Sequence, residues 1–150
     1  MRNFALAVLS ILAVASCSHP SPPQGRWEGH FESDEAMIVA RLEIGADGKV
    51  RVSAPDLLDI GAASDEDREG MRRRLADDLA QGWDEVAPRA MDFDGGVFRK
   101  PGGVAPQAVW DAKAKTMQLI VYPGAQPSIR IAMRRVNEFS DNPWSAGAIQ

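Results

Sequence analysis

The residues that could do chemistry are few and widely spaced in this chain. Its 150 residues include one cysteine, Cys17, and two histidines, His19 and His30. Two separated histidines cannot supply the three or four nitrogen and sulfur ligands that are typical of a zinc site. The sequence also has no Gly-x-Ser-x-Gly motif and no phosphate-binding glycine loop. We therefore expect neither a metal site nor a cofactor.

Carboxylate pairs are plentiful, but their spacing does not suit catalysis. Asp77-Asp78 and Asp84-Glu85 are neighbours in a predicted helix, where adjacent side chains diverge by about 100°. The two carboxylates of a glycosidase must instead converge across a cleft. Asp92-x-Asp94-Gly95 is similar to the start of a calcium loop, but the position where that loop needs Glu is Gly103. The sequence therefore favours a protein that is not an enzyme.

The N-terminal segment has the composition of a secretory signal peptide. Arg2 precedes an apolar run from Phe4 to Ala15, and small residues lead to Cys17. As a helix this run spans about 18 Å, short of the ~30 Å hydrocarbon core of a bilayer. Val14-Ala15-Ser16-Cys17 resembles a bacterial lipobox. The resemblance implies removal of residues 1–16, alkylation of Cys17 by a diacylglyceryl group, and acylation of its amine by a fatty acid such as palmitate.

This resemblance implies a lipid-anchored protein of the bacterial cell envelope. Ser18, rather than Asp, follows Cys17, and the sorting rule known for some bacteria then implies the outer membrane, facing the periplasm. Loss of Arg2 leaves 16 basic residues against 21 acidic, so the mature chain has a net charge of about −5. An acidic chain argues against a nucleic-acid partner and against a polybasic contact with anionic lipid. We expect the membrane to be reached through the lipid alone.

Residues 17–24 form a short tether, and the folded domain follows it. Three prolines between Ser18 and Gln24 favour an extended chain of roughly 20 Å. From Gly25 to Glu32, apolar residues then alternate with polar ones, which is typical of a half-buried strand. His19 falls in the tether, and His30 falls on the outward face of this strand. Neither histidine is expected to bind a ligand.

Gly25-Arg26-Trp27 resembles the Gly-x-Trp motif in the first strand of lipocalin-like (calycin) domains. The resemblance implies an antiparallel up-and-down β-barrel in which an arginine of the last strand lies over the indole ring of Trp27. Alternation along residues 128–136 places Arg135 inward and Arg134 in solvent. We therefore predict a structural pair between Trp27 and Arg135.

Alternating apolar residues predict the remaining strands. They lie at 36–44, 49–54, 91–94, 97–99, 107–111, 115–122 and 128–136, separated by turn residues. With residues 25–32 they give about eight strands in sequential hairpin order, enough for a barrel without exposed edges. We therefore predict a mainly β fold with a barrel over residues 25–137. Residues 138–150 form a polar tail in which Trp144 is the large residue able to pin it to the domain.

One α-helix is predicted as an insertion over residues 64–87. Met71, Leu75, Leu79 and Trp83 recur at helical spacing on one face. Ser64 is a natural N-cap, and Pro88 bars continuation. Arg72 to Arg74 are expected on the open face, with Arg73 and Arg74 spaced for ion pairs with Asp77 and Asp78.

Two non-enzymatic classes of function remain. In the first, which the lipocalin resemblance implies, the barrel binds a small apolar ligand. Its candidate lining is Trp27, Phe31, Phe93, Trp110 and Met117. These inward side chains could equally fill the core, and the protein would then be an envelope interaction or inhibitor module that binds a protein partner. A connected apolar cavity of about 300 Å³ or more in the barrel interior would favour the ligand-binding class.

Overall fold

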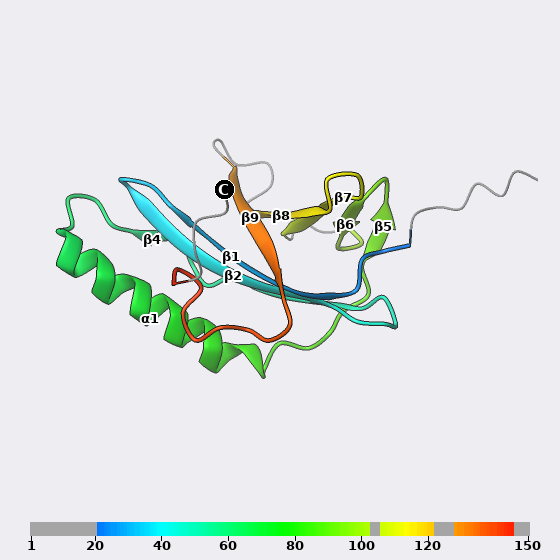
Figure 1. Ribbon diagram of the computed structural model, residues 1–150, viewed down its shortest axis with the longest axis horizontal. Helices are drawn as coiled ribbons and strands as arrows, with labels where there is room; N and C mark the ends of the chain where they lie inside the picture. Colours follow the sequence, from blue (N-terminus) through cyan, green and yellow to red (C-terminus); the bar gives the residue numbers. More distant parts are fainter. Residues whose placement is uncertain (1–20, 103–105, 122–127, 146–150) are drawn as a thin grey trace, which may run out of the picture.

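The computed structural model describes residues 21–102, 106–121 and 128–145, which form nine strands and one helix (Figure 1). Cys17 and the predicted signal peptide lie outside the described residues. In chain order the elements are β1 (Gly25–Glu32), β2 (Ala36–Ile44), β3 (Val50–Ser53), β4 (Leu58–Asp59), α1 (Asp65–Trp83), β5 (Asp92–Asp94), β6 (Val97–Arg99), β7 (Gln107–Asp111), β8 (Thr116–Val121) and β9 (Ile129–Val136).

The strands form one antiparallel sheet in the order β3-β2-β1-β9-β8-β7-β6-β5, with β4 added against β2. The last strand, β9, pairs with the first, as in an up-and-down barrel. The predicted mainly β fold with sequential strands and one inserted helix is therefore confirmed. The sheet curls into a half-barrel (Figure 1). Its terminal strands β3 and β5 do not pair, so the expected removal of all exposed edges is not achieved.

The concave face of the sheet holds the main hydrophobic core. Alternation along each strand turns one row of apolar side chains inward, as the sequence predicts. Strands β1 and β9 come close together because Gly29 has no side chain, and a Cβ there would clash with the carbonyl oxygen of Ala132. The buried members of this core are Trp27, Ile38, Ala40, Leu42, Ile44, Val50, Phe98, Ala108, Met117, Leu119, Val121, Ile131 and Met133.

Helix α1 packs on the opposite, convex face. Its buried residues Leu75 and Leu79 join Met37 and Val39 of β2 in a second apolar cluster. Ser64 caps the helix as predicted, accepting a hydrogen bond from the N–H of Asp67 at 3.2 Å. The helix ends at Trp83 rather than at residue 87. Its last turn contains no basic residue, and acidic residues follow directly, so the negative charges there repel the negative end of the helix dipole.

The C-terminal segment covers the convex face beside the helix. Phe139 packs edge-on against Trp83 with 4.8 Å between ring centroids, and Trp144 lies over His30 with a separation of 5.4 Å. Two aromatic residues, rather than Trp144 alone, therefore hold this segment against the domain. We call residues 137–145 the C-terminal strap.

Candidate functional site

The five side chains predicted to line a ligand cavity belong to the main core. Trp27 and Met117 are buried, and the other three are partly buried and pack against the same cluster. The rings of Trp27 and Trp110 meet edge to face at 6.5 Å, and Phe93 lies 4.5 Å from Phe98. These side chains therefore belong to the packed core of the concave face. None of them lines the pocket described below.

Arg135 lies over Trp27 as predicted, but its side chain is exposed rather than enclosed within the barrel. The two residues are direct neighbours on β9 and β1, and the guanidinium carbon is 5.7 Å from the centroid of the indole ring. This separation is within the ~6 Å range of a cation–π contact. Arg134 was expected in solvent, but it forms an ion pair with the fully buried Glu28. The strap covers the face on which Arg134 lies, and this is why the prediction was wrong.

A pocket of about 520 Å³ opens at the gap in the sheet between β3 and the chain that leads to β5. We call this gap the seam. One backbone bridge crosses it: the N–H of Val50 donates to Arg89 O at 2.8 Å, and the N–H of Arg89 donates to Val50 O at 2.9 Å. The apolar wall of the pocket consists of Val50, Val52, Ala54, Val86, Ala87, Met91 and Pro106. Val52, Ala54 and Met91 also pack on the main core, so the pocket is continuous with the concave face.

Arg51 fixes one wall of this seam pocket. Its Nη2 donates to Trp83 O at 2.6 Å, and its Nε donates to Val86 O at 2.9 Å. The same guanidinium lies 4.5 Å from the ring centroid of Trp83. Arg51 thus binds the carbonyl of the last helical residue, which also accepts from the N–H of Val86 at 3.2 Å, and the carbonyl of Val86 just after the helix. The segment that carries Val86 and Ala87 is held in place by a charged side chain from β3.

The rim of the seam pocket is charged. Glu85, Arg89 and Lys100 all contribute to its lining, and all three are exposed. None of these side chains takes part in an ion pair within residues 21–102, 106–121 and 128–145. The pocket therefore combines an apolar wall with two cations and one carboxylate at its mouth.

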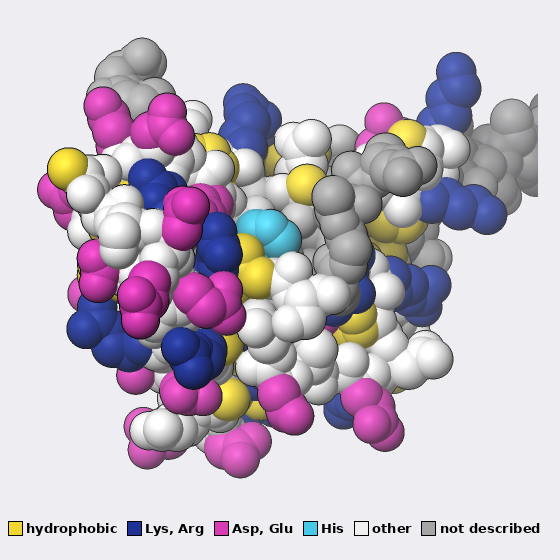
Figure 2. Space-filling view, turned by 60° about the vertical axis from the view of Figure 1, so that its left-hand side comes forward, with side chains coloured by type: hydrophobic (Ala, Val, Ile, Leu, Met, Phe, Trp, Pro, Cys, Tyr) yellow, Lys and Arg dark blue, Asp and Glu magenta, His cyan; other side chains and the backbone are white. Residues whose placement is uncertain are grey.

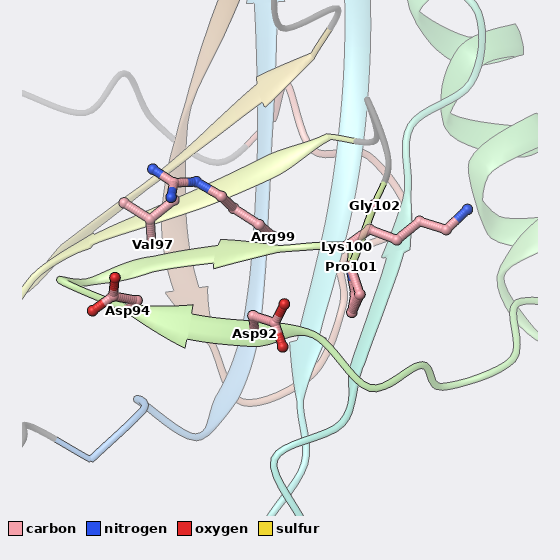
Figure 3. Close-up of a pocket in the computed structure, with 7 residues that line it drawn as sticks. All are labelled: Asp92, Asp94, Val97, Arg99, Lys100, Pro101 and Gly102. Carbon is pink, nitrogen blue, oxygen red and sulfur yellow. The ribbon is translucent and has the colours of Figure 1, made fainter.

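A second, more open depression of about 670 Å³ lies over β5 and β6, as Figure 3 shows. Its charged side chains do not converge on one point. The carboxylates of Asp92 and Asp94 lie apart, and Arg99 points away from Lys100. Over the part of the chain that the structure describes, no group of three or more His, Cys, Asp or Glu side chains could hold a metal ion. We assign no chemistry to this depression.

Sequence reasoning did not find the seam pocket. Its wall residues lie on β3, after α1 and after β6, and no local pattern links these segments. The inserted helix was the one feature of the sequence that could have indicated the pocket, since an insertion between two neighbouring strands can leave them unpaired.

The described residues include no helix that is both long enough and apolar enough to cross a membrane.

Comparisons of this chain with protein-family models, with curated proteins and with solved structures found no match.

Proposed function

We propose that this protein is a lipid-anchored protein of the bacterial envelope whose β domain binds a small apolar ligand in the seam pocket. The observation that carries this proposal is the apolar pocket of about 520 Å³ at the gap between β3 and β5. Pockets for small molecules commonly measure about 300–1,000 Å³ and combine apolar walls with a few polar groups. Val52, Ala54 and Met91 of the pocket wall pack on the same core as the aromatic side chains of the concave face.

The anchoring part of the proposal rests on the lipobox at residues 14–17. Strand β1 begins at Gly25, so the domain would be tied to the bilayer by the short proline-containing tether. Two or more acyl chains are sufficient for stable membrane attachment. Cys17→Ser should abolish labelling by radioactive palmitate and move the protein to the soluble fraction. If that variant still sedimented with membranes, the anchor would lie elsewhere in the chain.

Ligand binding can be tested by displacement of a fluorescent apolar dye from the mature chain carrying Cys17→Ser. A bulky residue placed in the pocket should block dye binding without unfolding the domain, because the pocket is open to solvent. Ala54→Phe makes this change in the pocket wall, and Ala132→Phe makes the same change at an exposed position of β9. We expect the first variant to lose dye binding and the second to retain it. Equal dye binding by both variants would refute the seam pocket as the site.

A second candidate function is that of a non-catalytic interaction or inhibitor module. The observation in its favour is that β3 and β5 end the sheet without a neighbouring strand. An extended segment of an envelope protein could pair with either edge. Such a module would show no saturable binding of the dye, whereas a ligand-binding domain would.

A further inference from the structure

We infer that the ligand of the seam pocket is a single-chain amphiphile with an anionic head group, which Lys100 and Arg89 hold at the pocket mouth. This inference rests on the proposed function and adds the chemical class of the ligand. It follows from the arrangement of charge at the pocket, in which the wall is apolar and the charges are confined to the rim.

The position of Arg89 is fixed by the fold. Its backbone forms both hydrogen bonds of the bridge to Val50, so residue 89 stays at the seam. Val50 also belongs to the pocket wall. Arg89 therefore lies next to the apolar wall, and its side chain is exposed to solvent. Its guanidinium forms no ion pair with the described residues, so its hydrogen-bond donors can serve an anionic group.

Lys100 lines the same pocket from a different segment of the chain. It directly follows β6, and Figure 3 shows its side chain extending away from Arg99 and from Asp92. Lys100 also lines the seam pocket together with Val52 and Ala54, and its side chain is exposed. Two cations from different segments thus approach one opening.

Glu85 is the opposing charge at this rim, and the balance still favours an anion. Two cations and one carboxylate leave a local excess of one positive charge. A cationic amphiphile would face both Arg89 and Lys100, and like charges brought together reduce affinity. A neutral apolar ligand would gain contacts with the wall but none with the cations. A carboxylate or a phosphate on a hydrocarbon chain uses both parts of the pocket.

The experiment compares three probes that share one ten-carbon chain: decanoate, decyl phosphate and decan-1-ol. Each probe is titrated below its micelle concentration into the mature chain carrying Cys17→Ser, and displacement of the dye is measured. Lys100→Met and Arg89→Met remove the two rim cations. Arg99→Met removes a neighbouring cation that does not line the seam pocket and that points away from Lys100, so it serves as the matched control.

We expect both anionic probes to bind more tightly than the alcohol. Each rim substitution should weaken binding of the anionic probes by about two- to fivefold, as expected for exposed charges, and should leave binding of the alcohol unchanged. Added salt should weaken binding of the anionic probes only. A preference for decanoate over decyl phosphate, or the reverse, identifies the head group.

Two outcomes would count against these proposals, and they can be told apart. If the alcohol binds as tightly as decanoate, and if Lys100→Met and Arg89→Met behave like Arg99→Met, the anionic class is wrong while the apolar pocket stands. If none of the three probes displaces the dye from the unsubstituted pocket, the proposed function itself fails.

Discussion

Glu28 of β1 is fully buried on the convex face of the sheet and is paired there with Arg134 of β9. Its carboxylate also accepts hydrogen bonds from Ser140, from the backbone N–H at 2.9 Å and from Oγ at 2.7 Å. The carbonyl of Ser140 in turn accepts a bond from Arg41 at 2.9 Å. A carboxylate placed away from water needs such partners, and here they come from a neighbouring strand and from the C-terminal strap.

Removing Arg134 should destabilise the domain. Arg134→Met leaves the Glu28 carboxylate buried with only Ser140 as a partner, and loss of one member of a buried pair costs about 3–5 kcal/mol. Arg134 is itself partly exposed, so we expect a decrease near the lower end of that range in the free energy of unfolding. Arg130→Met, at an exposed position on the same face of β9, should change stability little. Equal unfolding midpoints in urea for the two variants would contradict a stabilising pair.

Alternation along the strands predicted which side chains lie on each face of the sheet, but not which segments of the chain cover those faces. Glu28, His30 and Arg134 were correctly placed opposite the main core, since a period of two fixes the side of each residue. Whether that outer face meets water depends on segments far away in the sequence. Here the strap and helix α1 cover part of it, and no pattern within β1 or β9 carries that information.

The apolar stripe of helix α1 should hold the second cluster together. Leu75 is 4% exposed and belongs to the second apolar cluster, with side chains of β2 and with Ile60 after β4, as its helical spacing predicts. Leu75→Ala should lower the free energy of unfolding by about 2–4 kcal/mol, through lost burial and the cavity left behind. Arg74→Ala, on the exposed face of the same helix, is the control. If thermal unfolding gave the same midpoint for both, the helix would not be packed on the sheet.

Arg72 was expected on the open face of the helix, and this expectation is wrong. Its guanidinium bridges to both oxygens of Glu32, with Nε at 2.8 Å and Nη2 at 2.7 Å, and to Glu69 at 3.2 Å. Figure 2 shows acidic and basic side chains intermixed over the side of the molecule where α1 lies. The predicted ion pairs of Arg73 and Arg74 with Asp77 and Asp78 are not formed. Helical spacing identified the charged face, but the partner of Arg72 comes from β1.

The pair of Arg72 with Glu32 should make stability depend on pH in the acid range. The hydrogen bonds from Arg72 lower the pKa of Glu32 below its usual 4.5. A carboxyl group whose pKa is lower in the folded state stabilises the fold above its unfolded pKa, and this stabilisation is lost as the pH falls through the folded pKa. Arg72→Met should therefore cost about 1 kcal/mol near neutral pH and progressively less in acid.

Urea unfolding of wild type and Arg72→Met at several pH values below 7 would measure this convergence. Arg73→Met, which removes a cation of the same helix that has no ion-pair partner among the described residues, controls for net charge. A constant difference between wild type and Arg72→Met at all pH values would show that the ion pair does not contribute.

The candidate site was the least predictable part of this protein. The sequence identified Trp27, Phe93 and Trp110 as inward residues, and the structure places them in the core rather than around the pocket. The pocket exists because β3 and β5, the two ends of the sheet, do not pair. Whether a sheet closes into a barrel depends on all of its strands together, so no single segment of the sequence predicts it. Its charged residues Arg89 and Lys100 follow a helix and a short strand, in stretches without regular periodicity.

The contact between His30 and Trp144 of the strap should make the stability of the domain depend on pH. His30 is half-buried beneath the indole ring, and this burial lowers the pKa of His30 below its usual 6.5, although a backbone hydrogen bond at Pro143 and the charge of Glu32 oppose the shift. The unfolded chain then binds more protons than the folded one just below that value, so stability is complete above pH 6.5 and falls as the pH decreases. His30→Phe keeps an aromatic ring against Trp144 but cannot be protonated. On lowering the pH from about 7.5 to about 5.5, wild type should therefore lose more unfolding free energy than this variant. Tryptophan fluorescence during urea unfolding would measure the unfolding free energy of the two proteins at each pH. Equal losses of unfolding free energy in wild type and in His30→Phe would show that His30 titrates alike in the folded and unfolded chains.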